Sequence, residues 1–261
     1  LLVFGFCSGI ILVRPLLLLN ERSICMSLEV KIHDAQTIIL RELLFHPSAG
    51  FAELQKSTEL TSDHFNFHIG RLVELGLVEK VRRGHYSLSS RGKEYANRLD
   101  TDDNTIERQP KTAVILAIER EGKNGTEYLF QERLKNPYFG FWGLPSGKIR
   151  WGEAVLDTAM RESLEETGLT ADFRVAGVYH ERVILAETNE MMEDKIFFVC
   201  SGKNAKGTLL TDFEGGHNEW MTFDEAFKKE KKFDSFKVEI DILDSDEWLV
   251  ERLTTYTKEN F

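Results

Sequence analysis

Apolar residues recur with two different periods along this chain. Residues 31–46, 51–59 and 61–76 each carry an apolar stripe at intervals of three and four, which predicts three helices. Two short runs over 78–81 and 85–88 then alternate around a polar turn and predict a β-hairpin, followed by a last helix over 91–99. Strand-like runs dominate from residue 112 onward. The change of period predicts two domains.

The second half of the chain mixes the two patterns. Strands are expected over 112–118, 127–132, 173–183 and 195–201, and helices over 154–167, from 222 or 223, and over 247–256. This mixture predicts an α/β domain over residues 111–261. A polar segment that closes with Pro110 predicts a linker over 101–110, which leaves 26–100 as a small α+β domain.

Residues 1–25 form an apolar leader with an uninterrupted apolar run of 13 residues. A bilayer needs about 20 residues, and Arg14 would lie near the middle of the longer stretch. A basic region of the kind that begins a signal peptide is missing. We therefore expect the protein to start at Met26, with the leader outside the mature fold and no stable membrane association. A membrane anchor is the alternative.

The net charge of −10 is unevenly distributed. Residues 26–100 hold ten basic and ten acidic side chains, whereas residues 101–261 hold 21 basic and 32 acidic ones. An acidic domain repels polyphosphates at long range, so local cations must recruit them. The three cysteines form no C-x-x-C pair, which argues against a disulfide framework or zinc cluster and favours a cytoplasmic protein.

Three carboxylates are predicted to share one helical face, because Glu162 precedes Glu165 and Glu166 by three and four positions. Like charges at this spacing cost about 0.2–0.5 kcal/mol per pair. A hard divalent cation, Mg²⁺ or Mn²⁺, would offset this repulsion. The alternative is a solvated acidic surface with Arg161 as its counter-charge.

The residues around these carboxylates resemble the signature box of the Nudix hydrolase family. The matching positions are Gly147, Glu153, Arg161, Glu162, Glu165, Glu166, Gly168 and Leu169. The preceding FWGLPSG is similar to the approach W-G-x-P-G-G of the family. Ser163 departs from the pattern, which usually has an aliphatic residue there. We expect its hydroxyl to bond to the backbone one turn back and to loosen the helix locally.

The resemblance implies a Nudix α/β/α sandwich with a mixed sheet over residues 111–261. It also implies Mg²⁺- or Mn²⁺-dependent hydrolysis of a nucleoside diphosphate linked to another group, with a nucleoside triphosphate of MutT type as the first expectation. The carboxylates of Glu162, Glu165 and Glu166 and the carbonyl of Ser146 would bind the metal. Weaker substitutes are Glu187, Glu190 and Glu193, which are expected in a hairpin loop.

Further roles follow from the same resemblance. Arg161 and Glu153 would orient the carboxylates, and either Glu162 or Glu214 would be the general base. Gly147 would allow a tight turn beside the substrate. Trp142 either stacks on the substrate or packs in the core.

Residues 26–100 resemble a winged helix-turn-helix domain. The third helix would then enter a major groove with Asn66, His68 and Arg71, and the hairpin would bring Arg82 and Arg83 to phosphates. A net charge of zero is unlike a dedicated DNA-binding domain, so contacts with a protein partner or a homodimer are the alternative.

Two other functions fit the same pair of domains. One is a transcriptional regulator whose Nudix-like domain senses a nucleotide, and the other is an RNA 5′-end pyrophosphohydrolase that grips the transcript with the winged helix. The intact set of box carboxylates favours catalysis over sensing, because a sensor has no need to keep them all.

Overall fold

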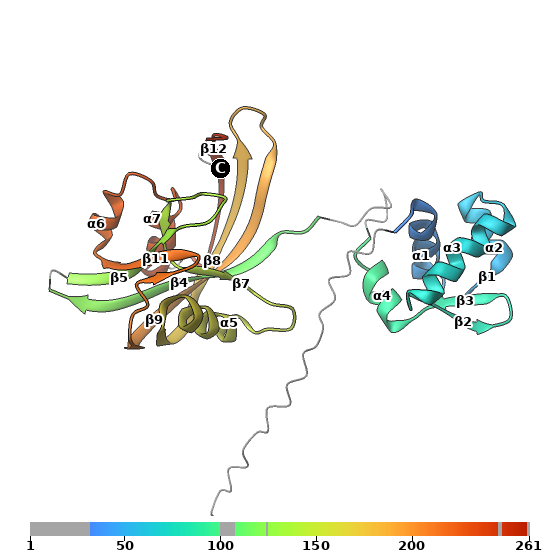
Figure 1. The fold of residues 1–261 in the computed structure, drawn as a ribbon, viewed down its shortest axis with the longest axis horizontal. Helices are drawn as coiled ribbons and strands as arrows, with labels where there is room; N and C mark the ends of the chain where they lie inside the picture. Colours follow the sequence, from blue (N-terminus) through green and yellow to red (C-terminus); the bar gives the residue numbers. More distant parts are fainter. Residues whose placement is uncertain (1–31, 100–107, 124, 245–246, 260–261) are drawn as a thin grey trace, which may run out of the picture. The chain divides into compact units, whose positions relative to one another are not determined.

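The computed structural model describes residues 32–99, 108–123, 125–244 and 247–259, and it divides into two compact units after Glu107 (Figure 1). This division falls within the predicted linker. The predicted leader and most of the linker lie outside the described residues. Within the described ranges, no helix is long and apolar enough to cross a membrane.

The N-terminal unit consists of helices packed beside a small antiparallel sheet. The helices are α1 (Asp34–Phe45), α2 (Phe51–Thr58), α3 (Ser62–Glu74) and α4 (Ser90–Ala96). The strands β1 (Ala49–Gly50), β2 (Val78–Arg82) and β3 (His85–Leu88) pair in the order β1-β3-β2. Phe65, Ile69 and Leu72 of α3 are buried at helical spacing. These elements lie close to the predicted ranges, and the winged helix-turn-helix assignment remains a prediction.

The C-terminal unit is built on one mixed sheet. Among the described residues, the strands are β4 (Lys111–Gly122), β5 (Gly125–Arg133), β6 (Trp142–Gly143), β7 (Ser146–Lys148), β8 (Leu169–Leu185), β9 (Met191–Gly207), β10 (Asp212–Phe213), β11 (Gly216–Met221) and β12 (Leu249–Tyr256). The main path is β10-β11-β5-β4-β9-β8-β12, with β6 on β5 and β7 on β4. The pairs β4–β9 and β8–β12 are parallel and the others are antiparallel.

Helices cover both faces of this sheet (Figure 1). Val114, Leu116 and Ile118 of β4 pack in a core with α5 (Val155–Glu162). The alternate residues Ala113 and Ile115 face α6 (Phe223–Phe227) and α7 (Phe236–Asp244). Successive strand side chains point to opposite faces, so β4 separates the two cores. The result is the α/β/α sandwich with a mixed sheet that the sequence predicts.

The helix predicted over 154–167 changes its geometry halfway. After α5, residues Ser163–Thr167 form a π-helix. Ser163 is fully buried and its hydroxyl donates forward to the carbonyl of Leu169 at 2.8 Å. The expectation of a bond one turn back is therefore wrong for Ser163. Instead the Thr167 hydroxyl bonds back to the Ser163 carbonyl at 2.5 Å. Such π-turns are rare and often occur at functional sites.

The helix predicted over 247–256 is wrong, since this segment contains the strand β12. It pairs in parallel with β8 from Leu249 opposite Val178 to Tyr256 opposite Leu185. Tyr256 is buried, and β-branched residues such as Val250 and Thr254 favour an extended strand. The partner strand lies about 70 residues earlier in the chain, so local periodicity could not indicate the pairing.

Candidate active site

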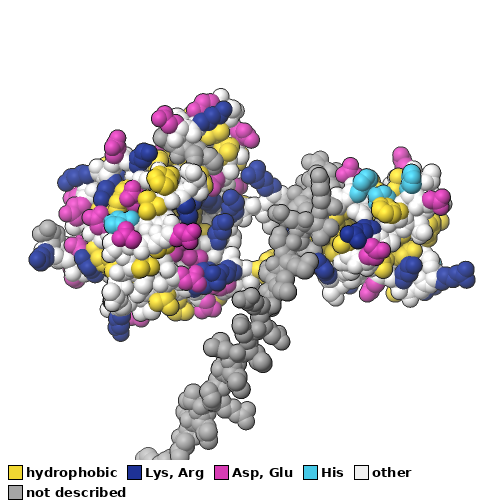
Figure 2. Space-filling model, viewed as in Figure 1, with side chains coloured by type: hydrophobic (Ala, Val, Ile, Leu, Met, Phe, Trp, Pro, Cys, Tyr) yellow, Lys and Arg dark blue, Asp and Glu magenta, His cyan; other side chains and the backbone are white. Residues whose placement is uncertain are grey.

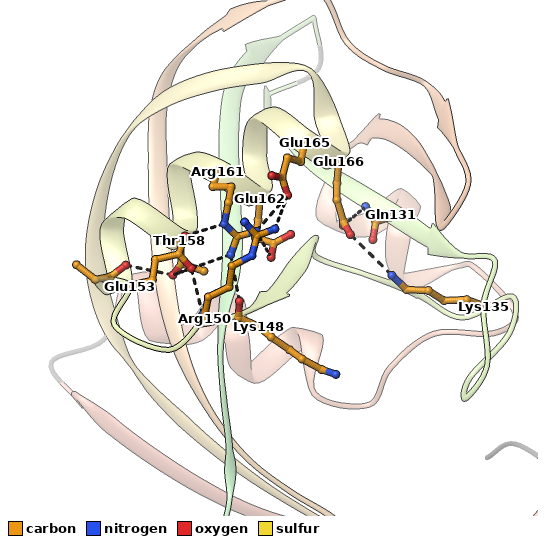
Figure 3. Close-up of polar contacts among 11 residues, drawn as sticks. Gln131, Lys135, Lys148, Arg150, Glu153, Thr158, Arg161, Glu162, Glu165 and Glu166 are labelled. Atoms are coloured by element: carbon orange, nitrogen blue, oxygen red, sulfur yellow. Dashed lines mark hydrogen bonds and ion pairs between the residues drawn. The ribbon is translucent and has the colours of Figure 1, made fainter. Parts of the chain in front are cut away.

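Arg161 lies at the centre of an ion-pair network at the end of α5 (Figure 3). Its Nε and Nη2 atoms donate to the two carboxylate oxygens of Glu153 at 2.7 and 2.8 Å. Its Nη1 atom donates to Glu162 at 2.6 Å and to Glu165 at 3.1 Å. A further bond of 3.2 Å reaches the carbonyl of Lys148. These contacts engage every N–H of the guanidinium group.

The network fixes charges as well as positions. The hydrogen bond from Arg161 lowers the pKa of Glu153 to about 2, so this carboxyl is ionised across the physiological range. The same bond raises the pKa of Arg161. Arg161 is 15% exposed and connects the end of β7, through the Lys148 carbonyl, to the carboxylates of Glu162 and Glu165. It thereby offsets the repulsion between Glu162 and Glu165.

Glu166 points to a different set of partners. Gln131 of β5 donates to its carboxylate at 3.2 Å, and the Lys135 ammonium lies 3.8 Å away. Asn218 of β11, which is 1% exposed, donates to the Glu166 carbonyl at 2.7 Å and accepts from Gln131 at 3.2 Å. Burial raises the pKa of Glu166. Sequence reasoning missed Gln131 and Asn218, because their contacts depend on the pairing of distant strands.

Gly147 leaves the space that Glu162 occupies. A Cβ atom built at Gly147 would lie 2.0 Å from the Cδ of Glu162 and 2.4 Å from its Oε1. Any other residue would therefore displace this carboxylate. Arg161 also donates to this carboxylate, so both the hydrogen bond and the space at Gly147 determine the position of Glu162.

A cavity of about 590 Å³ opens beside these residues, on the sheet face that α7 covers. Glu162 and Glu166 line it together with Ser146 and Gly147. Its wall also contains the cationic residues Lys111, Arg133, Lys135, Lys148 and Lys195. Lys111 and Lys195 are direct neighbours across β4 and β9. The cavity therefore places basic groups beside box carboxylates within an acidic domain.

The donors at this site fit a hard divalent cation by their chemistry, since the box supplies carboxylate oxygens. Gly147 brings the Glu162 carboxylate against the backbone of β7, the strand that also holds Ser146. In the described part of the chain, no three acidic, histidine or cysteine side chains converge on one point. Glu162 and Glu166, which line the cavity, are the residues placed to hold the cation, whereas Glu165 is half-exposed beside Arg150.

The structure places Glu214 and Trp142 outside the cavity wall. Glu214 is exposed between β10 and β11. Trp142 is 8% exposed and packs in the core, with the Lys229 ammonium 3.9 Å from its ring centroid, so the packing alternative describes it. Glu193 is not in a loop as predicted. It is buried on β9 and lines the cavity, because the strand extends further than its apolar run indicates.

In the N-terminal unit, the His68 side chain does not point outward from α3 as predicted from the sequence. It follows Phe65 by three positions and so faces α1, with its ring 4.6 Å from that of His33. Asn66, Arg82 and Arg83 are exposed, and Arg71 pairs with Glu74 at 3.0 Å. Figure 2 shows no single basic patch on the visible face of this unit, where acidic and basic side chains are interspersed.

Comparison with known proteins agrees with this geometry. The model of the NUDIX domain family matches residues 108–241. This match covers half of the chain, so the protein belongs to the NUDIX family. The matched region contains the complete box, the cavity residues of the sheet and the first part of α7.

Individual relatives are more distant. Over 99 residues the chain is 32% identical to an ADP-ribose pyrophosphatase of Methanocaldococcus jannaschii, which covers 36% of this chain and 56% of that protein. Over 88 residues it is 28% identical to the uncharacterized Nudix hydrolase YvcI of Bacillus subtilis, covering 33% and 54%. The chain thus spans about half the length of the curated relatives it matches. A solved MutT protein of Bacillus halodurans is 22% identical, with a TM-score of 0.46 over 58% of this chain and 93% of that one.

Proposed function

We propose that the C-terminal unit is a Mg²⁺-dependent hydrolase that cleaves the pyrophosphate bond of a nucleoside diphosphate linked to another group. A nucleoside triphosphate is the first substrate to test. The observation that carries the proposal is one cavity that holds two box carboxylates, Glu162 and Glu166, beside several lysines. Membership of the NUDIX family supports the same reaction class.

Three groups of residues at the site would have separate roles in this reaction. Lys111 and Lys148 draw the anionic phosphates into the cavity, against the net charge of the domain. Glu162 and Glu166 would hold a divalent cation, which when bound would neutralise charge at the phosphate oxygens and acidify the attacking water. Arg161 and Glu153 keep the carboxylates in place through the contacts described above.

Glu162 is the better candidate for the general base. It lines the cavity, whereas Glu214 is exposed and outside the cavity wall. Glu162 would accept the proton of the attacking water while the water oxygen bonds to phosphorus. The bond between phosphorus and the bridging oxygen then breaks, and the phosphate or nucleotide leaves.

The test is phosphate and pyrophosphate release from a panel of nucleotides by the full chain with Mg²⁺ or Mn²⁺. We expect Glu166→Gln to reduce kcat by about 10²-fold or more without unfolding the domain, as removal of a charge-stabilising group does. Asp157→Asn is the matched control, since Asp157 is an exposed acid on α5, the helix that leads into the π-helix holding Glu166. Full activity of folded Glu166→Gln would refute the assignment.

For the N-terminal unit we propose nucleic-acid contact through the exposed pair Arg82 and Arg83 at the β2–β3 turn. Phosphate contacts of this kind weaken as salt rises. Binding of duplex DNA and of 5′-triphosphorylated RNA should therefore be measured at two salt concentrations with wild type and Arg82→Ala/Arg83→Ala. Equal binding by both proteins would favour a protein partner or a homodimer as the occupant.

A further inference from the structure

Three buried carboxyl groups line the cavity at residues outside the box. Glu181 of β8, Glu193 of β9 and Glu239 of α7 are 7%, 7% and 5% exposed, and all three line the cavity that Glu162 and Glu166 also border. The roles proposed above use none of them. Burying a carboxyl group is costly without partners that satisfy it, so the partners decide what these groups can do.

Glu193 is satisfied within the fold. Lys195, two residues further on the same strand, forms an ion pair with it, and the Tyr138 hydroxyl donates to it at 3.1 Å. Its charge is therefore compensated by the protein. Glu193 thus serves to anchor Lys195 and Tyr138 in the cavity wall.

Glu181 and Glu239 are satisfied much less completely. In the described part of the chain, Tyr179 donates to Glu181 at 3.4 Å and Ser235 donates to Glu239 at 2.7 Å. A carboxylate has about four acceptor positions, so most of their hydrogen-bonding capacity is left over. Both side chains line the cavity, which makes a bound molecule the available partner.

The two groups also present different chemistry. Burial raises the pKa of Glu239 to about 8, and the charge of Glu181 raises it further. Burial also raises the pKa of Glu181, although the Lys195 ammonium acts in the opposite direction. Two such groups near one another do not both ionise, so one keeps its proton near neutral pH. Together they offer an O–H donor and a carboxylate acceptor. Phe197 and Phe233 add flat apolar surface to the same wall.

We propose that this end of the cavity binds the base of the substrate, with Glu181 and Glu239 selecting a purine that presents an amino group beside a ring nitrogen. The carboxylate accepts from the amino group and the carboxylic acid donates to the ring nitrogen. The negative charge of these carboxyl groups would repel a phosphate group at this position. A hydrocarbon group there would leave both carboxyl groups without hydrogen-bond partners. The inference rests on the proposed function and names the substrate class of the same site.

The test compares ATP with ITP, which lacks the amino group, in wild type, Glu181→Gln and Glu239→Gln. Wild type should prefer ATP, and Glu181→Gln should reduce the ratio of kcat/KM for ATP over ITP by about tenfold, the discrimination expected for one hydrogen bond to a charged group. Glu239→Gln should reduce this ratio less, because its amide N–H can still donate to the ring nitrogen. The kcat for ITP should stay within about threefold. Glu121→Gln, an exposed acid on β4, is the matched control.

Binding of AMP and IMP, measured by calorimetry, separates this inference from the proposed function. If no nucleotide is hydrolysed but Glu181→Gln weakens AMP and not IMP, the proposed function fails and the base site stands. If nucleotides are hydrolysed and both folded variants keep the wild-type ratio, the base site is refuted and the hydrolase stands. Near-ultraviolet circular dichroism establishes that each variant is folded. If Glu239→Gln does not fold, the comparison of Glu181→Gln with wild type is the test.

Discussion

Arg161 and Gly147 together fix the position of the Glu162 carboxylate. The guanidinium draws it by a 2.6 Å bond, and the missing side chain of Gly147 gives it room. A catalytic group displaced by about 1 Å can lose about 10²-fold in rate. The catalytic role proposed for Glu162 would therefore depend on a residue that has no side chain.

This dependence gives a prediction for Gly147→Ala. The new Cβ would overlap the Glu162 carboxyl, so we expect kcat to fall about 10- to 100-fold. Thermal stability should change little, because Gly147 is partly exposed and the Glu162 side chain can swing away. Steady-state kinetics and a melting curve measure the two effects. An active Gly147→Ala protein would show that the observed position of Glu162 is not required.

Single residues also mark how far sequence reasoning reaches. The resemblance to the box implies that Arg161 and Glu153 act together on the carboxylates, and in the fold the two side chains pair at 2.7 Å. The support of Glu166 by Asn218 joins residues 52 positions apart through β5 and β11. No local pattern encodes that contact. The same is true of Glu181 and Glu239, which line one cavity because α7 packs on β8.

At the scale of elements, the π-turn at the end of α5 depends on two hydroxyl groups. Ser163 and Thr167 are fully buried, and both donate to carbonyl groups at the point where the helix meets β8. An aliphatic residue at position 163 could not make the bond to Leu169. The departure from the usual box pattern thus has a structural use.

We expect Ser163→Ala to destabilise the C-terminal unit by about 1–3 kcal/mol, since the Leu169 carbonyl loses a buried donor. Urea denaturation followed by tryptophan fluorescence measures this change. All four tryptophans lie after residue 108, so the signal reports the C-terminal unit alone. A change below about 0.5 kcal/mol would mean that the bond contributes little.

His180 joins β12 to the rest of the sheet. Its two ring nitrogens lie 2.8 Å from Glu251 of β12 and 2.8 Å from Asp194 of β9. The bond to Glu251 and then that to Asp194 raise the pKa of His180 above its ordinary value of 6.5. The stabilisation is fully present below pH 6.5 and is lost as pH rises through the raised value.

This pH dependence can be tested with His180→Gln, because the Gln side chain does not titrate. It should be less stable than wild type at pH 6, and the difference should shrink at pH 9. Urea midpoints at the two pH values measure this, with Asp172→Asn on the same strand as a control for a lost charge. A difference that is the same at both pH values would exclude protonation of His180 as the cause.

The four longest strands of the C-terminal unit follow from their own sequence. The strands β4, β5, β8 and β9 contain strong apolar runs, and only their ends exceed the prediction. The segments β12 and α7 do not follow in this way. The sequence of β12 has the apolar spacing of a helix, but the segment pairs with β8 as a strand. The sequence of α7, FKVEIDILD, alternates like a strand, but the segment packs on the sheet as a helix. In both, tertiary contacts override local pattern.

For the whole molecule, Glu239 links folding of the C-terminal unit to pH. Its pKa is about 8 in the fold, against an ordinary value of 4.5. Between these values the folded unit holds a proton that the unfolded chain has released. The free energy of unfolding then falls by about 1.4 kcal/mol for each pH unit of increase.

Glu239→Gln should remove this slope. We expect the variant to gain stability relative to wild type as pH rises from 5 to 8, because the amide never needs to ionise. Urea titrations at pH 5, 6, 7 and 8, read by the same tryptophan signal, measure the difference. A constant difference between the two proteins would show that Glu239 ionises normally in the fold.

The five N–H groups of Arg161 have a consequence for how this protein can change over time. They hold Glu153, Glu162, Glu165 and the carbonyl of Lys148 as one unit. The first substitution among these residues would lose most of the benefit, and a second would lose little more. Mutations here are therefore strongly epistatic. A lineage that abandons catalysis should lose these residues together, whereas one that keeps it should hold all of them.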